Sequence, residues 1–338
     1  MNWAGVPVLV TGGASFIGSH LVDALVERKA RVTVVDDLSS GRLEHLQAHL
    51  SVGAVRFLQA DLRRQDTASS AVSGQHCVFH LAAAHGGRGY LETHEAACAS
   101  NFMLDGVVFD ACVRNGVESI VYASSGCVYP CRLQNSRDHI VKLSEGQVGP
   151  PFEADGIYGW AKLMGEKVLA AYAREHQFRA VSCRYFTAYG PRATESHAVM
   201  AMIARAFVKQ DPFEVWGTGE QIRNWTYVSD IVDGTLLAAE HFGDGDAVNI
   251  GTMEGTRVIE AAELVLRLTR HPAAIVKRPE MPTGPYYRIA DNAKLFNRTG
   301  WRPEVGFADG LARTLGWYYS AKSEASIRSE LAHLLFER

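Results

Sequence analysis

A short apolar run that ends in a glycine turn and passes at once into a helical pattern limits what this chain can fold into. The run is residues 8–21, VLVTGGASFIGSHL. In a strand–turn–helix of this kind, backbone N–H groups of the turn can approach a pyrophosphate, and the helix N-terminus adds partial positive charge. Serine stands at the middle position of the pattern Gly12-x-x-Ser15-x-x-Gly18. Because a third glycine is missing, the turn alone does not establish a dinucleotide site.

Apolar runs and helical patterns alternate through the first half of the chain. Alternation of this kind favours a parallel sheet with right-handed crossovers. The pattern becomes mixed after residue 190, with shorter elements. The expected fold class is therefore α/β, a Rossmann-type doubly wound parallel sheet with a smaller mixed α/β C-terminal substrate lobe. The strands expected are 6–10, 32–35, 55–58, 77–81 and 120–123, and the helices are 17–28, 101–115 and from 158 to about 173.

Composition excludes several classes of protein. With 338 residues, 47% of them hydrophobic, the chain can bury one large core and a smaller lobe. A net charge of −3 gives no electrostatic basis for binding nucleic acid or an anionic membrane. We find no uninterrupted apolar run of the about 18 residues that a membrane span requires, and no signal peptide, so the expected location is cytoplasmic. The six cysteines lack zinc-like spacing, which predicts reduced thiols and no bound metal.

Two carboxylates end the second apolar run. Asp36 lies 18 residues beyond Gly18, and Asp37 follows it. Near this offset a carboxylate accepts hydrogen bonds from the ribose hydroxyls of an adenine dinucleotide. The same carboxylate would repel the 2′-phosphate of NADP, so the expected cofactor is NAD. The alternative is that Asp36 is a loop or capping residue.

Small residues follow the fourth apolar run. Ala82, Ala83 and Ala84 would let the backbone approach a cofactor closely, although such alanines also serve simple packing. The next segment, residues 85–90 (HGGRGY), places three glycines in a loop at the carboxyl end of a strand. Doubly wound sheets bind ligands at that edge, so the segment is interpreted as a substrate loop or as a plain flexible loop.

A tyrosine and a lysine four residues apart carry the strongest chemical signal. Tyr158 and Lys162 share one face of a predicted helix. An ammonium group beside a phenol favours the phenolate, so Lys162 is expected to lower the pKa of Tyr158. Such a tyrosine can take the proton of an alcohol while hydride leaves for a nicotinamide, and Ser125 can orient that alcohol. The alternative is a solvated helix face.

With these features together, the chain resembles the extended short-chain dehydrogenase/reductases that modify nucleotide sugars. The resemblance covers roughly residues 6–318 and includes Ser125, Tyr158 and Lys162, which it implies are the catalytic triad. It implies a nucleotide-diphosphate sugar as substrate, with Arg223 and Arg288 on the diphosphate, a role that suits the planar guanidinium. Further matching stretches are residues 184–191 (RYFTAYGP), 217–223 (GTGEQIR), 248–251 (VNIG), 288–291 (RIAD) and 300–303 (GWRP).

The same resemblance implies two sets of binding residues. The residues that would bind NAD are Gly12, Ser15, Phe16, Ile17, Gly18, Asp36, Asp37, Asp61, Leu62, Ala82, Ala83, Asn101, Tyr158 and Lys162. The residues that would bind the substrate are Gly86, Gly87, Arg88, Ser125, Thr187, His197, Arg205, Gln221, Arg223 and Arg288.

Three reactions of this superfamily have to be distinguished. The 4,6-dehydratases carry an Asp-Glu pair after the serine, whereas this chain has Gly126 and Cys127, so dehydration is disfavoured. A simple 4-epimerase needs no second acid–base group. The segment 124–130 (SSGCVYP) and the glycine-rich loop look most like those of the GDP-mannose 3,5-epimerases. By that resemblance Cys127 and His197 are the acid–base pair, and Arg205 is a basic substrate contact.

The chemistry of epimerisation is compatible with this pair. Once C4 of the sugar is a ketone, the protons at C3 and C5 become acidic, and inversion needs one group on each face. A thiol (pKa about 8.5) and an imidazole (about 6.5) both lie near neutral pH. The alternatives are that Cys127 is an inert buried residue and that His197 lies on the surface without a role in catalysis.

Three segments are expected: 1–188 as the NAD-binding domain, with returning segments from the second half, 189–320 as the substrate lobe, and 321–338 as a C-terminal helix. By analogy with the superfamily, the protein is expected to be a homodimer. The non-enzymatic alternative is an NAD-binding regulator, which would be expected to have lost part of the triad that this chain retains.

Overall fold

A seven-stranded sheet, in which every neighbouring pair is parallel, forms the centre of the structure. The computed structural model describes residues 2–136 and 139–337. The strand order is β3-β2-β1-β4-β5-β6-β11, so the order reverses between β1 and β4, where doubly wound sheets bind ligands. The strands are β1 (Pro7–Thr11), β2 (Arg31–Asp36), β3 (Val55–Gln59), β4 (Cys77–His80), β5 (Ser119–Ser125), β6 (Arg179–Tyr185) and β11 (Asp246–Ile250).

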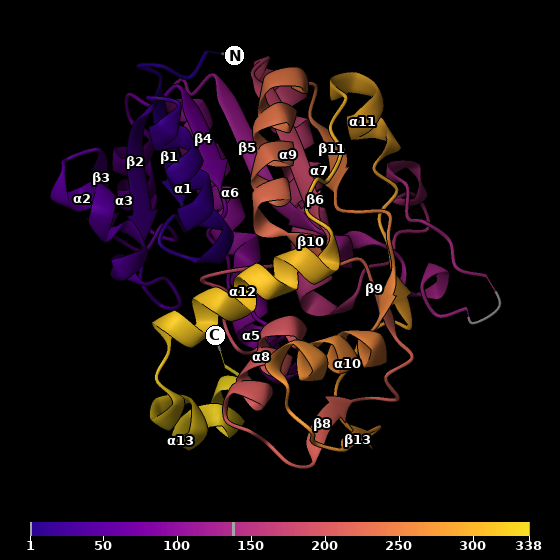
Figure 1. Ribbon diagram of the computed structural model, residues 1–338. Coiled ribbons are helices and arrows are strands. Elements are labelled where there is room, and N and C mark those ends of the chain that lie inside the picture. The colour runs from indigo at the N-terminus through magenta and orange to yellow at the C-terminus, as the bar shows by residue number, and fades with distance from the viewer. Residues whose placement is uncertain (1, 137–138, 338) are drawn as a thin grey trace.

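Helices cover both faces of this sheet, as the doubly wound prediction requires (Figure 1). One hydrophobic core joins α1 (Phe16–Glu27) and α9 (Val228–His241) to one face. A second core joins α3 (Gln65–Val72), α6 (Asn101–Arg114) and α7 (Gly156–His176) to the other. The predicted fold class and the five predicted strands are confirmed, with small shifts at their ends. The strands β6 and β11 were not among those predicted.

A smaller lobe has a hydrophobic core of its own and lies below the sheet in Figure 1. The chain crosses into this lobe more than once, because α9 and β11 return to the sheet between its segments. Its elements are β7 (Ala188–Tyr189), α8 (Ala198–Phe207), β8 (Phe213–Trp216), β9 (Ile222–Arg223), β10 (Thr226–Tyr227), β12 (Thr256–Arg257), α10 (Val258–Thr269), β13 (Ile275–Arg278), β14 (Tyr287–Arg288) and α12 (Phe307–Ala321). The short pairs are β7 with β10, β8 with β13, and β9 between β12 and β14.

The C-terminal helix α13 (Glu324–Leu334) lies inside the predicted range 321–338. Its Ile327 is buried in the core of the smaller lobe. Beyond the helix, the ring of Phe336 packs on Trp216 with centroids 5.2 Å apart, and it lies against Gly89. The last residues therefore join the smaller lobe to the segment that follows β4.

The glycine-rich segment after β4 is only partly a loop. The helix α4 (Arg88–Thr93) begins inside it, so the prediction of a loop over residues 85–90 is wrong from Arg88 onward. The physical reason is long-range packing, since Gly89 lies against the C-terminal Phe336. The remaining short helices are α2 (Gln47–Ser51), α5 (Glu95–Ala99) and α11 (Ala293–Thr299).

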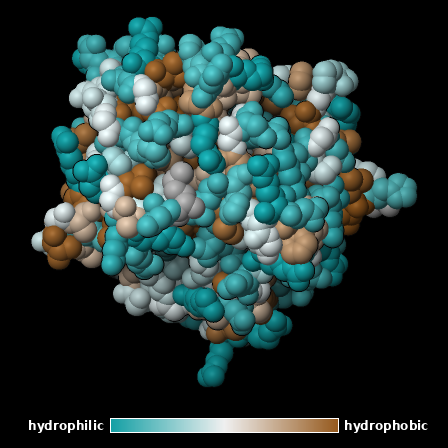
Figure 2. All heavy atoms as spheres, turned by 90° about the horizontal axis from the view of Figure 1, so that it is seen from above, coloured by the Kyte–Doolittle hydropathy of each residue, from teal (hydrophilic) through white to brown (hydrophobic). Residues whose placement is uncertain are grey.

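One stretch among the described residues, Glu95–Arg114, is long and apolar enough to cross a membrane. It consists of α5 and α6, and Leu104, Val108 and Phe109 on α6 are buried in the core against the sheet. We interpret it as a core helix of the α/β fold. Figure 2 shows mostly hydrophilic side chains on the upper face of the molecule, with scattered hydrophobic ones.

Candidate active site

A cavity of about 680 Å³ lies beside the glycine turn, at the carboxyl ends of β2, β4 and β5. Its wall is completed by α7, by the segment between β7 and α8, and by β9 and β14 of the smaller lobe. The cavity therefore runs from the strand-order reversal of the sheet to the lobe that was expected to hold substrate. Sites at this position are typical of doubly wound sheets.

The glycine turn fits the backbone so closely that side chains are excluded. Gly12 has φ +68°, and a Cβ there would lie 2.8 Å from the amide nitrogen of Ala82. A Cβ on Gly18 would overlap the carbonyl oxygen of Gly12. These contacts bring the start of α1 against the turn. Ser15, which stands at the middle position of the glycine pattern, lines the cavity together with Phe16 and Ile17.

The Asp36 carboxylate closes the end of β2. It accepts hydrogen bonds from the backbone N–H groups of Ala14 (3.0 Å) and Leu38 (2.9 Å). Burial raises its pKa, and these two hydrogen bonds oppose that change. The carboxylate thus joins the glycine turn to the end of β2 on the cavity wall, where a ribose would be recognised. Asp37, Asp61, Leu62, Ala82 and Ala83 also line the cavity.

Ser125, Tyr158 and Lys162 come together from β5 and α7. The Ser125 hydroxyl is a hydrogen-bond partner of Tyr158, and it accepts from the backbone N–H of Cys127 at 3.1 Å. Lys162 Nζ lies 6.0 Å from the centre of the Tyr158 ring and 4.6 Å from that of Tyr122. All three predicted triad residues line the cavity.

The predicted effect of Lys162 on Tyr158 is wrong for the protein without ligands. Burial raises the pKa of Tyr158 well above its usual value of 10, and negative charge on Cys127 and Asp105 acts in the same direction. The ammonium group of Lys162 lies nearer to the Tyr122 ring, and the charge that most strongly offsets its burial is Asp105 on α6.

The thiol of Cys127 faces the cavity beside a cation. Arg288 Nη1 lies 3.1 Å from Cys127 Sγ, and Arg288 Nη2 donates to Asp155 at 2.8 Å. Arg88 donates to the same Asp155 carboxylate at 2.9 Å. Two of the four predicted substrate arginines, Arg88 and Arg288, thus share one buried acid, and Cys127 lies beside Arg288.

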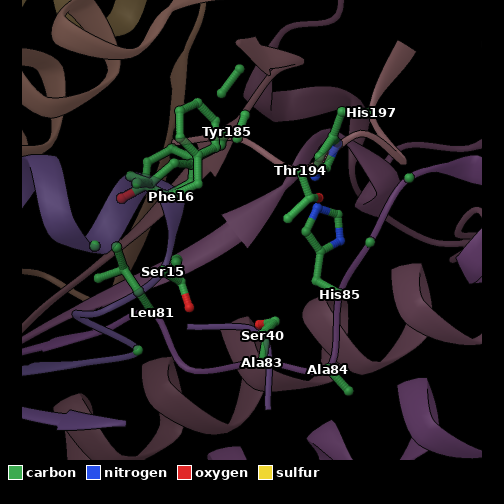
Figure 3. Close-up of a pocket in the computed structure, with 18 of the residues that line it drawn as sticks. Ser15, Phe16, Ser40, Leu81, Ala83, Ala84, His85, Tyr185, Thr194 and His197 are labelled. Carbon is green, nitrogen blue, oxygen red and sulfur yellow. The ribbon is translucent and has the colours of Figure 1, made fainter. Parts of the chain in front are cut away.

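Two histidines lie together on the other part of the wall (Figure 3). The His85 ring stacks on Tyr158 with centroids 4.8 Å apart, and it lies 5.4 Å from the ring of His197. Gly87 fixes this arrangement, because its N–H donates to Ser196 Oγ at 3.2 Å and a Cβ there would overlap the Ser196 carbonyl. The expected pKa near 6.5 for His197 is wrong, because burial lowers the pKa of this residue to about 4, so its imidazole is neutral at pH 7.

The family profile described as "NAD dependent epimerase/dehydratase family" matches residues 8–251. The chain belongs to this family. The match includes the glycine turn, Ser125, Tyr158 and Lys162, so the resemblance noted in the sequence is confirmed at the level of the family. The family's cofactor is NAD.

The relatives of this chain are named for different reactions. GDP-mannose 3,5-epimerase 1 of Oryza sativa subsp. japonica is 30% identical over 316 residues, covering 92% of this chain and 81% of the relative. UDP-N-acetyl-alpha-D-glucosaminuronate decarboxylase of Bacillus cytotoxicus is 29% identical over 336 residues, covering 94% and 98%. The crystal structure of UDP-glucose 4-epimerase from Thermotoga maritima, solved with UDP-glucose, has a TM-score of 0.83 and 29% identity, covering 93% and 98%.

The residues present fit NAD on structural grounds. Gly12 and Gly18 leave no room for a Cβ in the turn, and the buried Asp36 carboxylate stands at the end of β2. The turn would hold the pyrophosphate and Asp36 the adenosine ribose. Tyr158, Lys162 and Ser125 would lie beside the nicotinamide end. Arg42, which follows β2 and also lines the cavity, was not predicted as a site residue.

Three predicted binding residues of this family member do not line the cavity. Asn101 instead binds the backbone of Ala84 through both ends of its amide, at 2.8 and 3.0 Å, and so fixes the segment after β4. Arg205 lies on α8 under the ring of Trp216, 5.5 Å from its centre, and burial lowers its pKa to about 10. Gln221 is buried with its amide against Gly217.

The remaining predicted substrate residues line the cavity, but N–H groups of Arg223 already donate to the protein backbone. Thr187 and Gly86 line the cavity. Arg223 also lines it, but its guanidinium donates to the carbonyls of Thr283 and Pro285, both at 2.7 Å. Burial lowers the pKa of Arg223 to about 9, with Arg288 and Arg88 acting in the same direction.

His85 is the principal site residue that was not predicted. Its ring is exposed toward the cavity and contacts both Tyr158 and His197. The available signal was its position, directly after the alanine run and before the glycines.

Groups of three or more His, Cys, Asp or Glu side chains able to hold a metal ion were not found within residues 2–136 and 139–337.

Proposed function

We propose that this family member is an epimerase of a nucleotide-diphosphate sugar, which oxidises C4 transiently and exchanges protons at C5, C3 or both. The observation that carries the proposal is the position of the Cys127 thiol. It lies in the cavity beside Ser125 and Arg288, with the His197 imidazole on the wall of the same cavity. A triad for alcohol oxidation therefore shares one cavity with two groups that can exchange protons with carbon.

The chain's own residues account for each proton in this scheme. Tyr158, assisted by Ser125 and Lys162, takes the proton of the C4 hydroxyl and later returns it. NAD, when bound, would accept the C4 hydride and later return it to C4. The resulting ketone acidifies the C–H bonds at C3 and C5. His197, which is neutral at pH 7, can accept one of these protons, and Cys127 can deliver a proton to the opposite face.

The proposed substrate is a nucleotide hexose of the GDP-mannose type. The support is the 30% identity to a GDP-mannose 3,5-epimerase together with the cysteine that follows Ser125. Arg88, Arg223 and Arg288 are the predicted substrate arginines on the cavity wall, and they would exchange part of their present partners for the diphosphate and sugar hydroxyls. An arginine fork suits phosphate oxygens geometrically.

The test is incubation of the NAD-loaded protein with a panel of GDP-, UDP- and dTDP-hexoses in heavy water. Mass and NMR analysis of the recovered sugars then locate any label. We expect deuterium at C5, C3 or both in at least one sugar. Inversion at C4 without solvent label would replace the proposal by 4-epimerisation, the reaction of the Thermotoga maritima enzyme whose fold this chain shares. No turnover with intact NAD binding would favour a non-catalytic regulator.

We also propose that the protein is a homodimer that pairs through α6 and α7. Four large hydrophobic side chains on the outer faces of these packed helices are exposed: Phe102, Met103, Trp160 and Met164. An exposed apolar patch over two neighbouring helices is typical of a protein interface. A second copy, rotated by a twofold axis, would cover the same patch on both chains.

Met103→Asp should therefore convert the dimer into a monomer, because it places a carboxylate in the middle of that apolar interface. Light scattering during size-exclusion chromatography measures the mass directly. The matched control is Val52→Asp, which puts the same charge at a side chain that is 76% exposed and lies on another part of the surface. A monomeric wild-type protein, or a dimeric Met103→Asp variant, would contradict the proposal.

A further inference from the structure

Lys162, the lysine of the triad, is buried, and few neighbouring groups stabilise its positive charge. Its side chain is 1% exposed, and among the described residues no hydrogen-bond partner reaches Nζ. Burial lowers the pKa of such an ammonium group, since the charged form loses its hydration. The main opposing influence on Lys162 is the charge of Asp105. The state of the lysine therefore depends on that carboxylate.

Asp105 is itself buried, on α6, in a site built to keep it ionised. It accepts hydrogen bonds from His80 Nε2 at 3.1 Å and from the Tyr122 hydroxyl. Burial alone would raise its pKa, but Lys162 and the donors of His80 and Tyr122 hold the pKa of Asp105 below its usual value. A carboxylate with two donors and a neighbouring cation is the charged member of this cluster.

The backbone fixes which way the protons of this cluster point. Thr11 Oγ1 accepts from the N–H groups of Leu81 and Ala82, both at 3.1 Å, which occupies its lone pairs. Its own proton must then go to His80 Nδ1, 2.8 Å away. His80 is therefore the neutral tautomer with its proton on Nε2, directed at Asp105, and the negative charge stays on the carboxylate.

The fold also leaves space for the contact between the Tyr122 hydroxyl and Asp105. A Cβ on Gly165 of α7 would overlap the Tyr122 hydroxyl and lie 2.9 Å from Asp105 Oδ2. The other charged group of α7 nearby, Glu166, is already paired with Arg184 at 2.8 Å and accepts from Ser124 at 2.5 Å. The titratable groups around Lys162 are thus Asp105 from α6, Tyr122 from β5, His80 from β4, and Tyr158 and the paired Glu166 from α7.

We propose that Asp105 is a positioning residue for catalysis, which holds Lys162 as an ammonium ion at the site and is itself oriented by a chain of hydrogen bonds that runs from the backbone after β4 through Thr11 and His80. The inference rests on the proposed role of Tyr158 and Lys162 in alcohol oxidation. It adds that the charge of this pair is set by a residue buried on α6, the helix packed beside α7, which does not itself line the cavity.

The test is NMR titration of protein labelled with 13C at the lysine Cε, with the Lys162 signal assigned by its loss in Lys162→Met. We expect the wild-type signal to remain that of an ammonium ion through neutral pH. In Asp105→Asn the titration midpoint of Lys162 should fall by about one pH unit or more, a ten-fold or larger loss of proton affinity. The control is Asp110→Asn, which changes a partly exposed carboxylate of the same helix that is paired with Arg114.

An unchanged Lys162 midpoint in Asp105→Asn would overturn the proposal. If that variant does not fold, the wild-type titration still decides, because a Lys162 that loses its proton below neutral pH would equally overturn it. The midpoint is measured without any sugar. A failure of the proposed epimerase activity, seen as missing solvent label, is therefore distinguishable from a failure of this inference.

Discussion

Cys127→Ala should strongly slow the appearance of solvent deuterium at C3 and C5 of the recovered sugar while oxidation at C4 continues. General acid–base groups typically contribute about 10²- to 10⁴-fold to rate, so the exchange rate should fall by that factor. The triad is untouched, because Ser125 and Tyr158 do not depend on the thiol for their position in β5 and α7. The measurements are mass analysis of the sugar and absorbance of reduced nicotinamide on the same sample.

The neighbouring cysteine provides the matched control. Cys131 lies four residues further along and is only partly buried, and its replacement by alanine should leave exchange unchanged. Cys127→Ser separates chemistry from packing, since it keeps a polar acceptor near Arg288 but removes the thiol. Exchange at the wild-type rate in Cys127→Ala would show that another group moves the proton, and the 3,5-epimerase assignment would lose its main support.

Tyr158→Phe should stop the reaction earlier, before any ketone forms. Without the phenol oxygen no group accepts the proton of the C4 hydroxyl, and we expect hydride transfer to slow by about 10²- to 10⁴-fold. Both nicotinamide reduction and solvent labelling should fall together, in contrast to Cys127→Ala, where only labelling falls. Single-turnover absorbance of the reduced cofactor measures the first quantity directly.

Tyr172→Phe is the control for this variant, because it removes a phenol from the same helix, where the ring stacks on His176 away from the cavity. NAD affinity should be retained in both variants. Unchanged turnover in Tyr158→Phe would exclude the triad mechanism and would return the regulator hypothesis to consideration.

Those parts of the site that depend on local sequence were predictable. The glycine turn, the Asp36 position and the Tyr158–Lys162 spacing each lie within one strand–turn–helix or one helix, so their geometry follows from the chain itself. Parallel strands then bring their carboxyl ends to one edge of the sheet, which places Ser125 and the alanine run beside the turn. These residues all line the cavity.

Side chains whose environment comes from distant segments were not predictable. Arg205 lies on a helix in the expected region, but Trp216 from a later strand covers its guanidinium. Asn101 was expected at the cofactor, but its amide matches the backbone of Ala84 so well that it holds the segment after β4 instead. A motif gives the position of a residue in the chain, whereas the direction of its side chain depends on neighbours the motif does not contain.

Electrostatics showed the same limit. The sequence places Lys162 one turn from Tyr158, which suggests a direct effect on the phenol. The burial of Tyr158 and the carboxylate of Asp105 come from packing of α6, α7 and β5, and together they outweigh the lysine in the protein without ligands. Spacing along one helix could not reveal a charge contributed by another.

The return of β11 to the sheet means that the nucleotide-binding half of this protein is not encoded by one continuous stretch. A fragment ending at residue 188 would leave the β6 edge without its partner strand and would strip α9 from the core that it shares with α1. A single crossover between relatives would therefore not exchange one lobe alone, because α9 and β11 would come with the second half and complete the sheet from the other parent. Exchanges of sugar preference within this architecture must instead arise by substitution inside a chain that stays whole.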